Sequence, residues 1–509
     1  MASRSEQPVT LSGTPLLLAA IALAMSNFMV VLDTTIANVS VPHISGAIGV
    51  SPNQGTWIIT SYSVAEAMCV PLTGFLTARF GSVKLFIGAL IGFTVFSLLC
   101  GVSTSLSEIV IFRLGQGFCG GPLMPLTQTL LMRIFPKERH GQALGMWAMT
   151  TVIGPILGPI LGGVLSDDWS WHWIFFINLP VALVCITGAV VLLRPVETEL
   201  RPAAIDRGGL VLLVMWTSAL QLMLDLGHDR DWFGSPFIVA LAVIAAIGFA
   251  VFCAWELTAE HPAVDLRVFR HRGFTASVIA LAFAFGTFFT SAVIIPQWLQ
   301  ADLGYTATWA GYATAFTGIS SLIVAPMVGK ASMKFDPRIL VCFGILWLGM
   351  TSLLRTRWFN GVDFWSLAMP QFLQGAGMPF FFIPITALAL GAVDPKELES
   401  AAGLMSFVRT LSGAVGTAIV ATYWDDQTRV ARNDLAGKLN SGDVTTTLQN
   451  QGFDLSSIRG IVDQLVNSEA TAIATNHVFL MSAALFFVAA TLIWAAPKPT
   501  RQIDPGAAH

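Results

Sequence analysis

The stretch VVLDTTIANVSVP, from Val30 to Pro42, places an ionisable aspartate inside a segment that otherwise has the composition of a hydrophobic helix. Asp33 follows a long apolar run that begins at Leu16 and contains only two polar residues. A charged side chain is costly inside a bilayer, and an ionisable residue there is a functional hypothesis by default. The stretch therefore predicts a membrane span that carries a functional carboxylate.

The composition extends this interpretation to the whole chain. Of 509 residues, 54% are hydrophobic and 11% are charged, whereas soluble domains carry about 25% charged residues. A span needs about 20 apolar residues to cross about 30 Å of hydrocarbon, and by that length the sequence predicts an all-α membrane protein with about fourteen helices. The runs lie near residues 16–41, 54–78, 83–103, 107–132, 140–165, 172–193, 208–226, 236–256, 273–299, 307–329, 338–354, 362–391, 398–424 and 474–496.

Basic residues in the loops predict the orientation, because cytoplasmic loops carry an excess of Lys and Arg. With the N-terminus in the cytoplasm, the short loops on the outer side hold only Arg230, Arg355 and Arg357. An even number of spans then places both termini in the cytoplasm. The residues on the cytoplasmic side are Arg79, Lys84, Arg133, Lys137, Arg139, Arg194, Arg201, Arg207, Arg267, Arg270, Arg272, Lys330, Lys334, Arg338, Lys396, Lys498 and Arg501.

The sequence lacks the motifs of several other classes of protein. No G-x-x-x-x-G-K-[ST] phosphate loop occurs, which disfavours an ATP-driven pump. The six cysteines are scattered singly in apolar spans and the eight histidines are isolated, so the sequence predicts neither a metal site nor an enzyme. No block of basic residues indicates nucleic acid, and the net charge of −3 names no partner.

Two similar segments organise the chain. FRLGQGFCGGPLMPLTQ, Phe112 to Gln128, resembles PQFLQGAGMPFFFIPIT, Pro370 to Thr386, with Gln116 matching Gln374. Each is followed by a short charged loop and a Gly-rich helix, as expected of two related bundles.

The repeat is asymmetric at one position, where Arg113 corresponds to Gln371. We therefore expect the charge chemistry to lie in the N-terminal half. Two further spans, near 208–226 and 236–256, lie between the two bundles and look inserted. The predicted units are an N-terminal six-helix bundle, two inserted helices and a C-terminal six-helix bundle, over residues 1–196, 197–262 and 263–509.

Residues 425–473 are polar, and in this orientation they lie outside the cell membrane. Ile458, Ile461, Val462, Leu465 and Val466 recur at helical spacing and predict one amphipathic helix. Amphipathicity alone does not decide its role. The helix either rests on the membrane or caps the bundle, or it forms a docking surface for a periplasmic partner.

The motifs resemble those of a known family. LDTTIANVSVP, RLGQG and GPILGPILGG resemble signatures of the major facilitator superfamily, and with fourteen spans they look like its drug:proton antiporter branch. WHWIFFINLPV, IPQWLQADLGYTATWAG and VRTLSGAVGTAI are similar to segments of EmrB-type inner-membrane multidrug exporters of Gram-negative bacteria. The resemblance, which runs from about residue 16 to 496, implies proton-coupled export of lipophilic drugs by alternating access. It also implies a periplasmic adaptor, an outer-membrane channel, and no cofactor besides the proton gradient.

Three charged residues are the predicted proton-coupling site. At 1.5 Å per residue, Asp33 and Arg113 sit at a similar depth in their helices, so an ion pair between neighbouring helices is expected. Protonation of Asp33 would release Arg113 and act as a two-state switch; a static pair that only holds helices together is the alternative. Glu66, near the middle of its span, suits a proton carrier or a site for cationic drugs, and its alternative is a hydrogen-bonded structural acid.

GPILGPILGG has a mechanical interpretation. Gly154, Gly158 and Gly162 repeat every four residues and leave one helix face bare for close approach of a neighbour. Pro155 and Pro159 remove intrahelical hydrogen bonds and bend the helix. The resemblance implies that exporters use this bend to limit leakage and bias the direction of transport.

The loop GFLTARFGSVK resembles the superfamily's gating loop G-x-x-x-D-R-x-G-R-K. It keeps Gly74, Arg79 and Gly81, but Ala78 stands where the family has Asp. Because that Asp holds one conformational state in the family, the latch here must be weaker or built differently.

Aromatic and polar residues in the spans indicate a lipophilic substrate cavity. A proton-coupled importer of a small metabolite has the same architecture and is the alternative function, against which the Gly-Pro pattern argues. The predicted cavity residues are Thr34, Asn38, Tyr62, Gln116 and Gln297.

Overall fold

The described part of the chain is helical, as expected for a protein whose backbone must satisfy its own hydrogen bonds in a bilayer. The computed structural model describes residues 11–498 apart from 137–138, 199, 201–205, 261, 333, 395, 439–448 and 451–453. Among these residues, thirteen helices are long and apolar enough to cross a membrane. The remaining predicted run, 140–165, is helix α8 (His140–Val164), of 25 residues. The predicted all-α class is confirmed.

We call α1 to α10 the first half, α11 and α12 the inserted pair, and α13 to α19 the second half; the division at residues 196 and 262 stays a prediction. The first half comprises α1 (Gly13–Ile48), α2 (Pro52–Gly55), α3 (Trp57–Cys69), η1 (Val70–Leu72), α4 (Thr73–Phe80), α5 (Ser82–Val102), α6 (Leu106–Gly120), α7 (Leu123–Ile134), α8 (His140–Val164), α9 (Trp173–Phe176) and α10 (Asn178–Leu192). The inserted pair is α11 (Arg207–Gly227) and α12 (Pro236–Thr258). The second half comprises α13 (Arg272–Ala301), α14 (Ala307–Ala331), α15 (Pro337–Leu354), η8 (Arg355–Arg357), α16 (Phe364–Gly391), α17 (Leu398–Lys438) and α19 (Leu455–Leu492).

Two predicted spans are interrupted at prolines. The second span passes through a short 3-10 turn that contains Pro71, between α3 and α4. The fourth is divided between α6 and α7 at Gly121 and Pro122. Proline lacks the backbone N–H that an α-helix interior requires, so both interruptions have a local cause.

The outer surface is apolar, unlike that of a soluble protein. Leu183 of α10, Val211 of α11 and Met327 of α14 are each at least 66% exposed. Large apolar side chains with this exposure fit contact with lipid tails, whereas buried apolar residues pack between the helices. The chain is therefore a multi-pass membrane protein.

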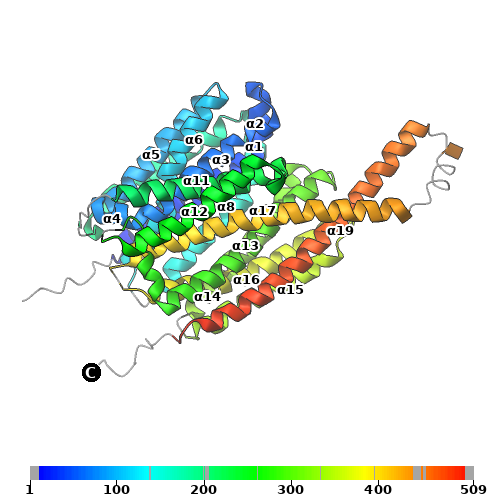
Figure 1. The fold of residues 1–509 in the computed structure, drawn as a ribbon. Coiled ribbons are helices and arrows are strands. Elements are labelled where there is room, and N and C mark those ends of the chain that lie inside the picture. The colour runs from blue at the N-terminus through cyan, green and yellow to red at the C-terminus, as the bar shows by residue number, and fades with distance from the viewer. Residues whose placement is uncertain are drawn as a thin grey trace, which may run out of the picture.

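The two halves meet along α8 and α14 (Figure 1). At Gly141 and Gly329 the two backbones lie so close that a Cβ on Gly141 would come within 2.5 Å of the Gly329 carbonyl oxygen. The start of α17 packs on α4, η1 and α7, which closes the halves together at the end that holds the gating loop. Helix α11 of the inserted pair contacts both α3 and α17.

The segment 425–473 differs from the prediction. Helix α17 does not end near residue 424 but continues to Lys438, and α19 begins at Leu455 rather than near 474. The two helices run on past the bundle as a hairpin (Figure 1), in which Arg432 pairs with Asp463 at 2.5 Å. The predicted amphipathic helix is thus the first part of the last span, and residues 439–448 and 451–453 lie outside the described residues.

Candidate functional site

A buried ion pair lies between the first and fourth predicted spans. Arg113 Nη1 of α6 is 2.6 Å from Asp33 Oδ2 of α1, and each side chain is 1% exposed. Long apolar runs on both helices remove water from the pair, so neither charge has solvent to stabilise it. Each charge therefore depends on the other, because removing one partner of a buried pair leaves an uncompensated charge.

Amide side chains complete the surroundings of Asp33. Its Oδ1 accepts hydrogen bonds from Gln116 Nε2 at 2.9 Å and from Asn178 Nδ2 at 2.7 Å. Gln116 Oε1 in turn accepts from Arg113 Nη1 at 2.9 Å, and Asn178 also donates to Ser97. The carboxylate thus collects donors from α6 and α10, so a change in its charge acts on three helices at once.

Aromatic rings hold the guanidinium in place. The centre of the Arg113 guanidinium lies 4.3 Å from the ring centroid of Tyr62 and 5.7 Å from that of Phe175, which is cation–π distance. Gly117 allows this approach, because a Cβ there would meet the Tyr62 carbonyl oxygen at 2.3 Å. The RLGQG motif therefore supplies both the cation and the close contact of α6 with α3.

Glu66 lies on α3 and is 8% exposed. It is within electrostatic range of Arg409 and Arg113, but among the described residues no hydrogen bond or ion pair joins it to either. Arg409 comes from α17 of the second half, where its guanidinium stacks on Trp147 at 5.0 Å and approaches Met124 Sδ at 3.3 Å. Glu66 therefore faces charges from both halves and is not part of the Asp33–Arg113 pair.

An apolar pocket lies where the halves meet. This pocket is small and opens between α8, α14 and α16. Its lining consists of Ala148, Met149, Ser321, Ala325, Met378, Pro379 and Phe382. These are apolar residues apart from the serine, which suits a lipophilic compound better than a polar metabolite.

The predicted cavity residues are not part of that lining. Tyr62 and Gln116 belong to the Arg113 surroundings described above. Thr34 donates to the backbone oxygen of Val31, and Asn38 and Gln297 are exposed. The structure thus pairs Asp33 with Arg113, and only two of the five predicted cavity residues, Tyr62 and Gln116, lie beside that pair.

The glycine face of α8 lies against α1. A Cβ on Gly154 would come within 2.5 Å of Val31, and one on Gly158 within 2.2 Å of Thr35 Oγ1. Gly162 faces the Ile36 carbonyl oxygen. Helix α8 runs unbroken past Pro155 and Pro159, whose side chains lie outside the described residues.

The acidic residues near the gating loop come from other parts of the chain. The Glu197 carboxylate accepts from the backbone N–H groups of Val83 and Lys84, in the first turn of α5. Its position explains Gly81, which has φ of +87° and would place a Cβ 2.5 Å from Glu197. The carboxylate therefore occupies a helix N-terminus, where negative charge is stabilising.

A second acid reaches this region from the other half. Glu399, at the start of α17, forms an ion pair with Arg133 at the end of α7. Gly74 of the gating loop faces Ser400, where a Cβ would lie 2.8 Å from the Ser400 Cα. With Ala78 in place of the usual Asp, the Arg133–Glu399 pair joins the two halves here.

One charged residue lies where the sequence did not predict it. Arg355, expected in an outer loop, is 0% exposed. It contacts Gln371 and Gln374 of α16, which correspond to Arg113 and Gln116 in the repeat. A charge at a helix end normally reaches water, so no local sequence pattern indicates this burial.

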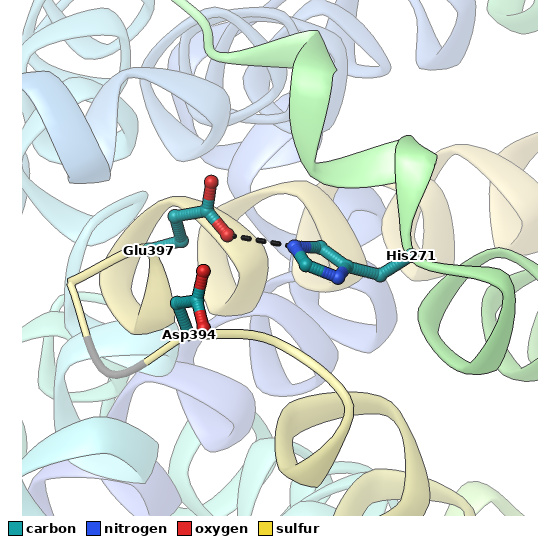
Figure 2. Close-up of side chains that lie close together, drawn as sticks. All are labelled: His271, Asp394 and Glu397. Carbon is teal, nitrogen blue, oxygen red and sulfur yellow. Dashed lines mark hydrogen bonds and ion pairs between the residues drawn. The ribbon is translucent and has the colours of Figure 1, made fainter.

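Figure 2 shows a group with metal-binding chemistry at the start of α13. Ligand atoms of His271, Asp394 and Glu397 lie within 4.8 Å of one another, and His271 Nε2 is 2.8 Å from Glu397 Oε2. Arg270 also pairs with Glu397 at 2.7 Å. Because that guanidinium already balances the carboxylate charge, the geometry favours an ion-pair cluster over a metal site.

Comparison with known sequences extends over nearly the whole chain. A family model described as Major Facilitator Superfamily matches residues 23–417. Multidrug export protein EmrB of Escherichia coli (strain K12) is 40% identical over 500 residues, which cover 97% of this chain and 98% of that protein. Fatty acid resistance protein FarB of Neisseria gonorrhoeae is 40% identical over 494 residues, which cover 96% and 97%.

A solved structure has the same arrangement of helices. The crystal structure of the human organic anion transporter MFSD10 (TETRAN) superposes with a TM-score of 0.58 and covers 93% of this chain and 100% of that one. At 14% sequence identity, the likeness is one of fold.

Proposed function

This chain belongs to the Major Facilitator Superfamily, and from that premise we propose that it is a proton-coupled antiporter that exports lipophilic compounds across the bacterial inner membrane. The family resemblance seen in the motifs is confirmed by the family model and by the 40% identity to a multidrug export protein. The apolar pocket between the halves supports a lipophilic substrate. Both termini lie in the cytoplasm in this proposal.

The Asp33–Arg113 pair is the observation that carries the proposal. With Asp33 ionised, the pair joins α1 to α6 and the carboxylate holds Gln116 and Asn178. A proton on Asp33 removes the charge that Arg113 balances and weakens each charge-assisted hydrogen bond. The three helices then favour a different packing, which is how one proton biases a two-state transporter.

The closed end of the molecule supplies the second element of the mechanism. In the proposed orientation the gating loop is cytoplasmic, so the Arg133–Glu399 pair and the contact of α17 with α4 hold the cytoplasmic side shut. Opening that side requires the pair to break, while the halves rock about the α8–α14 contact. Substrate then enters the pocket from the cytoplasm or the inner leaflet.

Transport in proteoliposomes with an imposed pH gradient tests the function. An antiporter moves drug opposite to protons and concentrates it on the acidic side. A proton-coupled importer, the alternative, moves its substrate with protons toward the alkaline side. Nigericin, which collapses the gradient, should abolish accumulation in either case. Accumulation on the alkaline side, or movement that ignores the gradient, would contradict the proposal.

We also place adaptor docking on the α17–α19 hairpin, as part of a tripartite assembly with an outer-membrane channel. Val430, Leu455 and Leu465 are each more than half exposed on this hairpin, and exposed apolar residues beyond a bundle suit a protein partner. Ile458, in contrast, is 2% exposed and packs within it.

Replacing both Val430 and Leu465 by Ser should weaken capture of a co-expressed periplasmic adaptor in a pull-down. Transport in proteoliposomes, where no adaptor is present, should be unchanged. Gln464→Ser, at the exposed neighbour of Leu465, is the matched control. Equal capture by the double variant and this control would move the docking site elsewhere.

A further inference from the structure

Arg355 is a buried cation, and no counter-ion lies beside it in the described part of the chain. It lies in η8 (Arg355–Arg357), directly after α15, and its side chain is fully enclosed. Among the described residues, no carboxylate lies within ion-pair distance of it. Removing an unpaired charge from water is expensive, and within a membrane protein such a residue indicates a functional site whose partner has to be found.

The hydrogen bonds around Arg355 leave several N–H donors without an acceptor in the described part of the chain. Its Nη2 donates to Gln371 Oε1 and to Gln374 Oε1, both at 2.5 Å. Within the described part of the chain, Arg355 Nε and Nη1 and Gln374 Nε2 have no acceptor. Buried N–H groups without acceptors are costly, and a set made only of donors around a guanidinium is complementary to an anion.

Aromatic rings form the other side of this cluster. The Arg355 guanidinium lies 5.4 Å from the ring centroid of Phe479 and 5.9 Å from that of Trp358. Trp298 stacks on Trp358 with centroids 5.7 Å apart, and its indole N–H also lacks an acceptor in the described structure. Donors beside broad apolar faces fit a molecule with an anionic head and an apolar body.

The repeat relates this cluster in the second half to the Asp33–Arg113 pair in the first half. Gln371 and Gln374 correspond to Arg113 and Gln116, so each half has a guanidinium beside the matching glutamine. In the first half Asp33 balances that guanidinium. In the second half no described carboxylate balances Arg355.

We propose that Arg355, with Gln371 and Gln374, forms an anion-binding subsite that takes the carboxylate of an acidic, apolar substrate. The assignment rests on the proposed export function. Because the cluster is enclosed here, the subsite receives its ligand in another stage of the transport cycle, when the aromatic rings around Arg355 move apart.

Binding of two probes to the purified full-length protein tests this assignment. Decanoate has the carboxylate and decanol has the same apolar body without charge. Arg355→Gln should lower the affinity for decanoate at neutral pH about tenfold or more, as expected for loss of a hydrogen-bonded charge. Its affinity for decanol should equal that of the parent. Arg357→Gln removes the same charge from an exposed position two residues away and should change neither.

Three results would overturn the assignment: unchanged decanoate affinity in Arg355→Gln, an equal loss for both probes, or an equal loss in Arg357→Gln. Arg355→Lys, which keeps the charge and loses the fork of donors, should retain part of the affinity. It replaces Arg355→Gln if that variant elutes as an aggregate. Binding is measured without a proton gradient, so its outcome stands even if export fails.

A small inorganic ion is the competing occupant. Decanoate titrations are repeated in chloride and in sulfate at equal ionic strength. Equal affinities support a substrate carboxylate. Weaker decanoate binding in chloride, together with chloride-dependent thermal stabilisation of the parent but not of Arg355→Gln, would assign the cluster to a resident chloride and overturn its assignment to substrate.

Discussion

The two halves share a Gln-Gly motif, yet the buried guanidinium beside it has different partners in each. In the first half Arg113 has a carboxylate at 2.6 Å, itself held by two amides. In the second half Arg355 has two glutamine oxygens and no carboxylate among the described residues. The motif is thus repeated while the charge balance is not.

This difference assigns separate tasks to the halves. A paired carboxylate can take up a proton and release its partner, so the first half is suited to coupling. A guanidinium with unused donors cannot exchange a proton at physiological pH, but it can bind an anion. In the proposed mechanism the first half takes the driving ion and the second half takes the substrate, and four predictions test how far this separation holds.

The largest expected effect comes from removing each guanidinium in turn. Arg113→Gln leaves Asp33 buried without a partner and should cost roughly 3–5 kcal/mol of stability. Arg355→Gln removes a charge that has no partner, so it should be neutral or stabilising. Thermal unfolding of both variants in one detergent measures the contrast. Equal destabilisation would show that Arg355 has an undetected counter-ion, which breaks the comparison.

Glycine packing should instead be equivalent in the two halves. Gly158 of α8 lies against Thr35 of α1. A Cβ on Gly416 of α17 would lie 2.5 Å from the Gly286 carbonyl oxygen of α13. Replacing either by Leu should cost about 1–3 kcal/mol through overpacking and abolish efflux. Gly88→Leu, at a position with no atom within 4 Å, is the control. Unaltered efflux in only one variant would show that close packing also differs between the halves.

The ion pair between the halves should have a smaller effect. Arg133 and Glu399 are 28% and 11% exposed, and a partly exposed pair contributes up to about 1 kcal/mol. Glu399→Gln should therefore favour cytoplasmic opening by about fivefold, measured as faster labelling of a cysteine placed in the apolar pocket. Exchanging the two charges should restore the parent rate. If the variant with exchanged charges is labelled as fast as Glu399→Gln, the ion pair does not hold the cytoplasmic side closed.

The smallest effect concerns Asp302, the acid that follows α13. Burial raises the pKa of its carboxyl above the ordinary value, while Thr471 donates to it. Ionisation is therefore disfavoured in the folded state, and stability is lost as the pH rises through the raised pKa. At neutral pH Asp302→Asn should be stabilising by under about 1 kcal/mol, because solvent screens a half-buried group. Thermal unfolding between pH 5 and 7.5 checks the sign. Destabilisation by this variant would instead show that the folded state stabilises the ionised carboxylate.

Sequence reasoning predicted what depends on local pattern. Apolar runs of span length predicted the helices, and the Gly154–Gly162 spacing predicted a face for close packing, which lies on α1. Counting residues placed Asp33 and Arg113 at one depth, and their side chains meet. Helix periodicity and rise are local properties, so they can be followed along a single chain.

Contacts between distant residues were missed. Asn178 stands as one polar residue in an apolar run, which was a usable signal, but nothing in the sequence joins it to Asp33. Glu399 pairs with a residue 266 positions away, and Arg355 ends a helix, where a charge normally meets water. The last two helices extend beyond the predicted spans, because an apolar run can end in polar composition without ending the helix. Where two helices pack on each other, each needs apolar residues only on the face that it buries. Both can therefore continue as helices with polar residues on their other faces.

The most direct test of the account separates substrate movement from proton coupling in Asp33→Asn, which keeps the side-chain shape and removes the titratable group. In proteoliposomes without a pH gradient, the variant should exchange labelled for unlabelled drug as the parent does. With an imposed gradient, the parent should concentrate drug on the acidic side and the variant should only equilibrate it. Gradient-driven accumulation by Asp33→Asn equal to that of the parent would contradict the assignment of proton coupling to the Asp33–Arg113 pair.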